Sequence, residues 1–440
     1  MSTQSKIAFH TLGCKLNFSE TSSLANQAID AGYQRVEMDE QADIYVVNTC
    51  SVTENADKEC RYIVRKIKRT APESKVIIIG CFAQLKPKEI AEIEGVDMVL
   101  GATEKFNLLE NIDKIQESTT TQIKADDIKE INEFIPSFSS GDRTRTFLKV
   151  QDGCDYFCTF CTIPLARGRS RSQSISKTLE VFQQAVDTGV KEIVLTGVNT
   201  GDFGKTGDGK RRTEESFYDL VNAIEQQYQD TEIRVRVSSI EPNLLTDEII
   251  DLVAKSKIFM PHFHIPLQSG SDEMLASMQR KYDTHFYRNK IEFIKSKMPH
   301  AAIGVDVIVG YPEELASHFE ESYRFVNSLP VSYLHVFTYS ERANTRAVKS
   351  EISVPIEVRR DRNKQFRILS DKLKKAYYEA HLGNEYSVLF EHENDNGFMN
   401  GYTENYIRVR AKFDEKMIGK IVRFKLEKVN PFLFVEGEIV

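Results

Sequence analysis

Long apolar runs and a secretory leader are both missing from this chain of 440 residues. The longest apolar runs, such as Val76–Ile79, are far shorter than the roughly 20 residues that cross a bilayer. The N-terminal segment Met1–Phe9 does not have a basic stretch followed by an apolar one, so it does not resemble a signal peptide. We therefore expect a cytoplasmic protein with no membrane partner.

Positive charge is not in excess either. The formal net charge is −7, which argues against a protein that coats nucleic acid by bulk charge. Basic residues still gather locally, within Arg61–Arg69, Arg143–Arg171 and Arg359–Lys375. Each cluster taken alone is better interpreted as a solvated helix or loop face, although a local basic groove stays open as an alternative.

The chain also lacks an even number of cysteines, which complete disulfide pairing would need. There are seven: Cys14, Cys50, Cys60, Cys81, Cys154, Cys158 and Cys161. An odd number in a cytoplasmic chain disfavours a disulfide framework. Metal ligation or redox chemistry is then the leading use for these side chains.

The length predicts two or three domains. Strand and helix patterns alternate over the first hundred residues, which predicts an α/β domain with a parallel sheet at 1–117. The expected strands are 7–12, 43–47 and 75–79, and the expected helices are 19–31 and 56–69. A polar stretch rich in threonine and serine follows, and we interpret 118–140 as a linker.

The alternation restarts after the linker and predicts a second α/β domain at 141–372. Strands are expected at 146–150, 192–196, 233–238, 263–266, 303–309 and 333–339. Six such units predict a partial, TIM-like (βα)6 barrel, with its chemistry in loops at the carboxyl ends of the strands. Short strands separated by turn residues then predict a small antiparallel β-barrel at 373–440.

The strongest local signal is the spacing Cys154-x-x-x-Cys158-x-x-Cys161. Three thiolates so close together can hold three corners of a four-iron cluster. A fourth ligand is missing nearby, which leaves one iron open to the amino and carboxylate groups of S-adenosylmethionine (SAM). Phe160 is well placed to pack on the SAM adenine. The alternative is half of a zinc site, but structural zinc needs four ligands and no second cysteine pair follows at finger spacing.

Three other cysteines share a different pattern. Cys14, Cys50 and Cys81 each come just after a predicted parallel strand. The carboxyl ends of parallel strands share one edge of a sheet, so these side chains could converge and hold a second cluster. The alternative is that they are small buried apolar residues. Cys60 lies within a helical pattern, and we interpret it as structural.

At these residues the chain resembles the methylthiotransferase family of radical SAM enzymes, over nearly its whole length. The N-terminal matching segments are Thr11–Asn17 (TLGCKLN), Val47–Thr53 (VNTCSVT) and Ile79–Cys81 (IGC). The later ones are Asp152–Pro164, Arg167–Ser172 (RGRSRS), Leu195–Asn199 (LTGVN), Ser238–Pro242 (SSIEP) and His264–Asp272 (HIPLQSGSD).

The resemblance implies a radical SAM [4Fe-4S] cluster on Cys154, Cys158 and Cys161, which are then the catalytic cysteines. It implies an auxiliary [4Fe-4S] cluster on Cys14, Cys50 and Cys81, and a C-terminal TRAM domain that binds RNA. The implied reaction inserts a methylthio group into an unreactive C–H bond, with SAM as both methyl donor and radical source. The implied partners are a tRNA anticodon stem-loop, an electron donor such as a flavodoxin or ferredoxin, and a sulfur source.

Within the family, the chain looks most like the branch that modifies N6-threonylcarbamoyladenosine at tRNA position 37. Leu12–Asn17 and Asn48–Asp57 support this assignment. The isopentenyladenosine branch usually reads Cys-Gln-Met-Asn at the first site, and the ribosomal-protein branch reads Cys-Pro-Lys-Asn. Methylthiolation of isopentenyladenosine or of a ribosomal-protein aspartate is the alternative within the class. From another class, the alternative is a non-catalytic RNA-binding protein that contains zinc.

Further site residues follow from their positions at predicted strand ends. Gly197, Glu241, Gln268 and Asp306 are candidates for SAM contacts, with ordinary hydrogen bonding at the barrel rim as the alternative. Asn17 and Asn48 flank the auxiliary cysteines and are candidates for ordering that pocket, with turn formation as the alternative.

Two departures from the family pattern concern backbone conformation. Gly310–Leu315 reads GYPEEL in place of the more usual Gly-Phe-Pro-Gly-Glu-Thr, so a changed rim loop is expected there. Asn344 also stands where glycine is commoner, which is a mild change because asparagine tolerates left-handed conformations.

Overall fold

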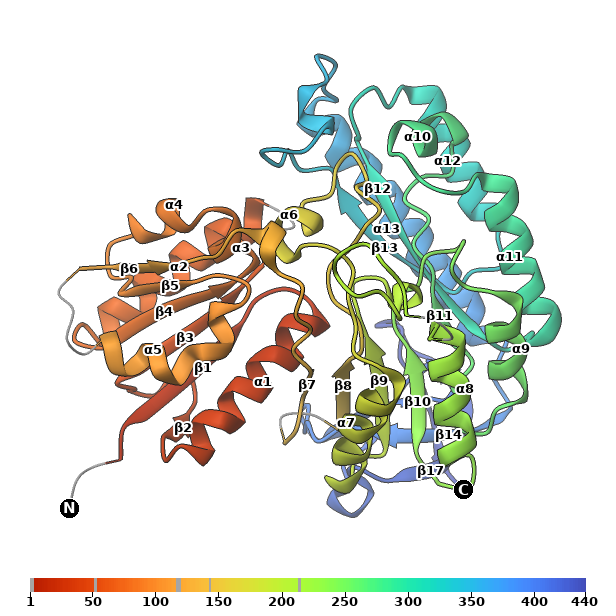
Figure 1. The fold of residues 1–440 in the computed structure, drawn as a ribbon. Helices are drawn as coiled ribbons and strands as arrows, with labels where there is room; N and C mark the ends of the chain where they lie inside the picture. The colour runs from red at the N-terminus through yellow and green to blue at the C-terminus, as the bar shows by residue number, and fades with distance from the viewer. Residues whose placement is uncertain (1–3, 51–53, 116–119, 142–143, 213–214) are drawn as a thin grey trace.

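The computed structural model describes residues 4–50, 54–115, 120–141, 144–212 and 215–440. The N-terminal α/β domain lies beside a larger central domain of strands and helices, and the C-terminal strands lie against the lower end of that central domain (Figure 1). Within the described residues, no helix is long and apolar enough to cross a membrane.

The N-terminal domain contains a six-stranded parallel sheet in the order β2-β1-β3-β4-β5-β6. Its strands are β1 (Lys6–Thr11), β2 (Gln34–Val36), β3 (Ile44–Thr49), β4 (Lys75–Gly80), β5 (Met98–Leu100) and β6 (Gln122–Lys124). Its helices are α1 (Lys15–Asp30), α2 (Glu54–Thr70), α3 (Cys81–Leu85), α4 (Pro87–Ala91) and α5 (Leu108–Ile115). Strand β3 is buried along its whole length and β4 along nearly all of it, as is typical of central parallel strands with both faces covered. The predicted parallel α/β domain is confirmed.

The segment predicted as a linker contributes a strand to each of two sheets. Strand β6 pairs with β5 at the edge of the N-terminal sheet. Strand β7 (Ser137–Phe138) pairs antiparallel with the first strand of the central domain. Both strands are very short, and no residue of β6 is fully buried, so they leave no hydrophobic periodicity in the sequence. The predicted boundary between 117 and 118 lies outside the described residues.

The central domain is an open barrel of six parallel strands, as predicted. They are β8 (Arg145–Lys149), β9 (Glu192–Thr196), β10 (Arg234–Val237), β11 (His262–His264), β12 (Ala302–Val309) and β13 (Tyr333–Thr338). Two hydrogen-bonded sheets, β10-β9-β8-β7 and β11-β12-β13, are joined by single parallel bridges such as Ser239 to His264. The main helices are α7 (Ile175–Asp187), α8 (Phe217–Tyr228), α9 (Asp247–Lys255), α11 (Thr284–Lys297), α12 (Ala316–Ser328) and α13 (Ile356–Glu379). Shorter helices are α6 (Ile163–Arg167) and α10 (Asp272–Ser277).

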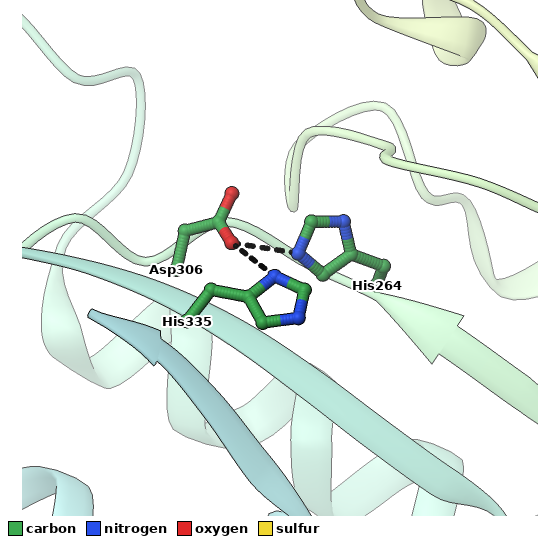
Figure 2. Close-up of side chains that lie close together, drawn as sticks. All are labelled: His264, Asp306 and His335. Carbon is green, nitrogen blue, oxygen red and sulfur yellow. Dashed lines mark hydrogen bonds and ion pairs between the residues drawn. The ribbon is translucent and has the colours of Figure 1, made fainter. Parts of the chain in front are cut away.

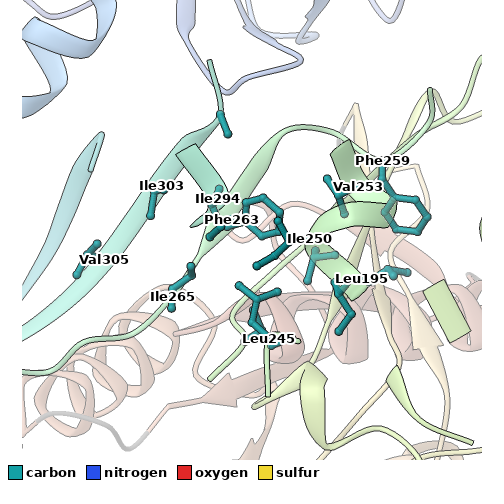
Figure 3. Packing of buried hydrophobic residues seen from close by; sticks show 14 of the residues in the cluster. Leu195, Leu245, Ile250, Val253, Phe259, Phe263, Ile265, Ile294, Ile303 and Val305 are labelled. Atoms are coloured by element: carbon teal, nitrogen blue, oxygen red, sulfur yellow. The ribbon is translucent and has the colours of Figure 1, made fainter. Parts of the chain in front are cut away.

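Apolar side chains of the central strands pack against the helices that cover them. Leu195, Phe263 and Ile303 from three strands meet Ile250 of α9 and Ile294 of α11 (Figure 3). Each of these five side chains is completely or almost completely buried, so truncation of one of them to alanine costs about 2–5 kcal/mol. This core fixes the strand ends that carry the site.

The C-terminal domain is a closed five-stranded barrel in the order β14-β15-β16-β18-β17. Its strands are β14 (Glu385–Phe390), β15 (Phe398–Thr403), β16 (Arg408–Lys412), β17 (Ile421–Val429) and β18 (Val435–Ile439). The predicted antiparallel arrangement is wrong at one seam, because β16 and β18 pair in parallel. An odd number of strands requires this result: alternating directions around five strands must bring two like directions together where the barrel closes.

Candidate active site

The first cysteine set lies in the loop after β8, at the carboxyl end of the central strands. Cys154, Cys158 and Cys161 line one cavity of about 290 Å³. Gly153 enters the loop with φ of +71°, and a Cβ on this residue would lie 2.0 Å from the Arg169 carbonyl oxygen. The Cys154 amide donates to the Gly168 carbonyl oxygen at 3.0 Å. Only glycine therefore allows the cysteine loop to lie so close to residues 168 and 169.

A guanidinium group approaches this cysteine set from outside the motif. Arg280 donates to Cys158 Sγ at 3.0 Å and forms an ion pair with Glu241. Burial raises the pKa of all three thiols, to about 12 for Cys161, while Arg280 opposes this effect at Cys158. Buried thiols of this kind become thiolates only when a nearby cation compensates their charge, as an iron–sulfur core does. Three sulfur donors beside a guanidinium group therefore fit such a core.

Four of the five predicted SAM-contacting residues line the same cavity: Phe160, Glu241, Gln268 and Asp306. The ring of Phe160 meets Tyr311 edge to face at 6.4 Å. Gly197 does not line the cavity, whereas its successors Val198 and Asn199 do. A Cβ on Gly197 would lie 2.9 Å from Oε1 of Gln151, an atom that accepts a hydrogen bond from the Asn199 amide at 2.9 Å. Gly197 thus gives Gln151 room to hold the strand end.

Asp306 is the centre of a polar group inside the barrel. His264 Nε2 lies 2.7 Å and His335 Nδ1 lies 3.2 Å from the same Asp306 oxygen (Figure 2). Burial alone would raise the pKa of Asp306, but the two imidazoles outweigh burial and hold this pKa below its ordinary value. The three side chains could in principle hold a metal ion. Their ligand atoms are instead engaged with one another, which fixes the carboxylate at the wall of the cavity.

The second cysteine set lies at one edge of the N-terminal sheet. Cys14, Cys50 and Cys81 follow β1, β3 and β4, which are neighbours in the sheet. Gly13 has φ of +99°, and a Cβ there would lie 2.6 Å from the Cβ of Cys50. The loops that carry Cys14 and Cys50 therefore touch. Cys14 is exposed, whereas Cys50 and Cys81 are buried, and burial raises the pKa of Cys81.

Asn17 and Asn48 tie these loops together. The Asn17 side chain donates to the carbonyl oxygens of Leu12 and Thr49, at 2.9 and 3.0 Å. Asn48 donates to the Asn17 carbonyl oxygen at 3.0 Å, and a Cβ on Gly80 would lie 2.3 Å from Asn48 Oδ1. The two amides thus contact the chain next to all three cysteines.

A buried ion network connects the two cysteine sets. Arg167, in α6 just beyond Cys161, binds Glu20 of α1 at 3.1 Å, Asp152 at 2.9 Å and Asn17 Oδ1 at 2.6 Å. Further cations surround the two carboxylates, namely Lys105, Lys149 and Arg171. With Arg167, four cations thus face two anions. The excess positive charge lies beside Cys81, which lines the same small cavity as Lys105 and Arg167.

The sequence did not identify Arg280 or this ion network as parts of the site. Arg280 follows α10 without any motif of its own. Lys149, Arg167 and Arg171 belong to the second basic cluster, and the interpretation of that cluster as a solvated face is wrong for these three, which are at least 94% buried as side chains. The one available signal was the RGRSRS segment, which follows the cysteine loop in the sequence.

Cys60 is buried in the core of the N-terminal domain.

Three segments match known families. Residues 6–101 match the uncharacterised protein family UPF0004, residues 148–326 the radical SAM superfamily, and residues 379–440 the TRAM domain. Among solved structures, the radical SAM methyltransferase TsrM from Kitasatospora setae has a TM-score of 0.57 at 14% identity, over 79% of this chain and 77% of that one. That likeness concerns the fold. The chain is thus a radical SAM enzyme, and its superfamily implies SAM and a [4Fe-4S] cluster.

Full-length relatives narrow the assignment. The threonylcarbamoyladenosine tRNA methylthiotransferase of Bacillus subtilis is 39% identical over 99% of this chain and 96% of its own. The enzyme of that name from Aquifex aeolicus is 35% identical over 95% and 99%. The tRNA-2-methylthio-N(6)-dimethylallyladenosine synthase of Bacillus subtilis is 28% identical over 99% and 86%. This chain belongs to the threonylcarbamoyladenosine tRNA methylthiotransferase family.

Proposed function

We propose that this enzyme converts N6-threonylcarbamoyladenosine at tRNA position 37 to its 2-methylthio derivative. The observation that carries the proposal is the pair of cysteine sets, one at the barrel rim and one at the edge of the N-terminal sheet, joined through Arg167. One set suits radical generation, and the other suits storage of the sulfur to be transferred.

The residues around the first set would bind SAM and hold it in place. Cys154, Cys158 and Cys161 would ligate the first cluster, which with SAM supplies a 5′-deoxyadenosyl radical when bound. Phe160 would pack on the adenine, and Glu241, Gln268 and Asp306 would contact the polar groups of SAM. Burial raises the pKa of Glu241, and Arg280 opposes that effect. The Arg280 guanidinium would thus pair with Glu241 while it compensates the thiolate of Cys158.

A second [4Fe-4S] cluster would lie on Cys14, Cys50 and Cys81. The excess of cations in the adjacent ion network supports this assignment, because three thiolates and a cluster carry net negative charge. Asn17 and Asn48 would hold the three cysteine loops at fixed spacing. The enzyme would also need an electron donor, such as a flavodoxin or ferredoxin, and a sulfur source.

The tRNA would contact a basic groove between α13 and the C-terminal barrel. Arg367, Lys374 and Arg408 line a cavity of about 390 Å³ together with Tyr402 and Tyr406, and Asp371 is also in its wall. Cations for phosphates next to aromatic rings for bases are typical of RNA loop recognition. In the third basic cluster, Arg359 and Arg362 are buried in ion pairs with Glu341 and Glu314 and are not available to RNA.

Two measurements test the function. Protein reconstituted without oxygen should bind about eight iron atoms, whereas a Cys14→Ala, Cys50→Ala, Cys81→Ala variant should bind about four. The variant should still cleave SAM but not methylthiolate tRNA. Mass spectrometry of nucleosides from tRNA treated with enzyme, SAM and reductant should show 2-methylthio-N6-threonylcarbamoyladenosine. A product formed only from isopentenyladenosine, or only on a ribosomal protein, would contradict the proposed substrate. A colourless protein that contains zinc would contradict the assignment to the iron–sulfur enzymes.

A further inference from the structure

A separate cavity of about 270 Å³ lies where all three domains meet. The N-terminal domain contributes Cys14, Lys15 and Phe18, and the C-terminal barrel contributes Tyr406. The central strands contribute Arg145, Phe147, Val194, Arg236 and His262. This cavity does not share lining residues with the SAM cavity. It includes Cys14, so anything bound in it lies next to the proposed sulfur-bearing cluster.

One basic side chain of the cavity has no carboxylate partner among the described residues. Arg145 binds Glu391 at 2.9 Å, and Arg236 binds Glu192 at 2.7 Å, so each guanidinium group has a carboxylate partner. Among the residues that the structure describes, Lys15 forms neither a hydrogen bond nor an ion pair through its ammonium group. Its helix α1 begins at this residue, with Cys14 as the N-cap. An anion in the cavity would therefore find a free ammonium group as its partner.

A buried imidazole in the same wall also has a free polar atom. His262 is only 5% exposed, and its Nε2 lies 2.8 Å from the Tyr333 hydroxyl. Its Nδ1 is buried and forms no hydrogen bond with any described residue. The ring is stacked on Tyr406 at 4.1 Å, so it is held in place. When Tyr333 donates to Nε2, Nδ1 carries the proton and needs an acceptor.

We infer that this cavity binds the carboxylate of the threonylcarbamoyl group, with Lys15 as its ion partner and His262 Nδ1 as a hydrogen-bond donor. The inference rests on the proposed function and deepens it, because it assigns the residues that select the substrate. A threonylcarbamoyl group carries a carboxylate and a hydroxyl, whereas an isopentenyl group offers neither. Phe18, Phe147 and Val194 make part of the wall apolar, which strengthens a charge-assisted hydrogen bond in the cavity.

An RNA backbone phosphate is the other source of an anion for Lys15. The two sources are separated by three anticodon stem-loops of one sequence, which carry N6-threonylcarbamoyladenosine, its methyl ester or plain adenosine at position 37. Binding to reconstituted full-length protein is followed by fluorescence anisotropy. The native protein should bind the carboxylate-bearing loop about tenfold more tightly than the ester.

The Lys15→Met variant should lose that preference by weakening only the carboxylate-bearing loop. Lys372→Met, which removes an exposed lysine of α13, should keep the preference. Equal weakening of all three loops by Lys15→Met would assign the lysine to a phosphate and overturn the inference. An unchanged preference for the carboxylate-bearing loop would also overturn it. Iron content is measured in parallel to verify the cysteine site.

The His262→Phe variant is an independent test, because His262 is far from the cysteines in the sequence. It keeps the stacking on Tyr406 and removes Nδ1, so it should reduce the preference for the carboxylate several-fold. An unchanged preference would remove His262 from the proposal. If native enzyme methylthiolates the carboxylate-bearing loop but neither variant changes the preference, the inference fails while the proposed function stands. If no loop with threonylcarbamoyladenosine is modified, the proposed function itself fails.

Discussion

Arg280 donates a hydrogen bond to the sulfur of Cys158 at 3.0 Å and at the same time pairs with Glu241. The guanidinium group is only 3% exposed, so its charge acts in a poorly screened environment. It therefore connects a proposed cluster ligand to a proposed SAM contact. Loss of this one side chain should affect both.

We expect Arg280→Gln to make the first cluster harder to reduce. Removal of a buried positive charge beside a thiolate destabilises the more negative, reduced cluster, so the reduction potential falls. Formation of 5′-deoxyadenosine should slow by about tenfold or more. A redox titration followed by electron paramagnetic resonance measures the first effect, and chromatography of the product measures the second. Arg324→Gln, at an exposed ion pair on α12, is the control; an Arg280 variant with the native potential would contradict the expectation.

Gly13→Ala should disrupt the second cysteine set. The new Cβ would lie 2.6 Å from the Cβ and 2.9 Å from the Sγ of Cys50, so the loops must move apart. We expect reconstituted protein to lose about half of its iron. Gly32→Ala is a matched control, because Gly32 has a similar φ of +95° but no atom within 4 Å of the added Cβ. An equal loss of iron in both variants would show that backbone strain alone explains the result. A full iron content in the Gly13→Ala variant would contradict the expectation.

Local pattern predicted much of the fold and of the cysteine sets. Strands β3 and β4 were predictable because they are apolar runs bounded by turn residues. The central strands were predictable from short runs that are either mainly apolar, as in β12, or alternate polar and apolar residues, as in β10 (RVRV). Strands β6 and β7 were not, because their pairing depends on partners and leaves no pattern of its own. Arg280 was likewise hidden, since 122 residues separate it from Cys158.

Backbone conformation at the rim loop shows a second limit. The sequence predicted a changed loop because Glu313 stands where glycine is usual. Glu313 nevertheless adopts the left-handed conformation, with φ of +66°, and Asn344 does so at +68°. The Glu313 amide donates to the Ile352 carbonyl oxygen at 3.1 Å, which helps to hold a conformation that costs a residue with a side chain about 1–2 kcal/mol. Local propensity does not reveal such a case, because the compensating contacts are made elsewhere in the chain.

Glu20→Gln should destabilise the joint between the first two domains. Its carboxylate is completely buried among Arg167, Lys105 and Lys149, and its loss would leave Asp152 as the one carboxylate of this network and Lys105 without its ion partner. Removal of one partner from a buried ion group costs about 3–5 kcal/mol. Urea denaturation measures the loss, with Glu320→Gln at an exposed pair as the control. A loss below about 1 kcal/mol would show that the joint does not depend on this carboxylate.

The same carboxylate predicts a dependence of stability on pH. Burial alone would raise the pKa of Glu20, but Arg167, Lys105 and Lys149 outweigh it and hold the pKa well below its ordinary value of 4.5. The unfolded chain therefore takes up a proton before the folded protein does as the pH falls. The stability due to Glu20 is complete above about pH 4.5 and is lost progressively below it. Denaturation at several pH values should show a shallower acid slope for Glu20→Gln than for the native protein; parallel slopes would contradict the assignment.

Lys374→Gln should weaken tRNA binding in a way that depends on salt and not on the modification at position 37. Lys374 lines the groove with Arg367 and Arg408, and its charge would be matched by a phosphate of the RNA backbone. Removal of one phosphate contact reduces the slope of log affinity against log salt by about 0.7–0.9. Titrations at several salt concentrations measure this slope. Lys372→Gln on the same helix lies outside the groove and should leave the slope unchanged. Because the threonylcarbamoyl carboxylate is assigned to Lys15, Lys374→Gln should weaken modified and unmodified stem-loops equally; selective weakening of the modified loop would place the nucleoside in this groove instead.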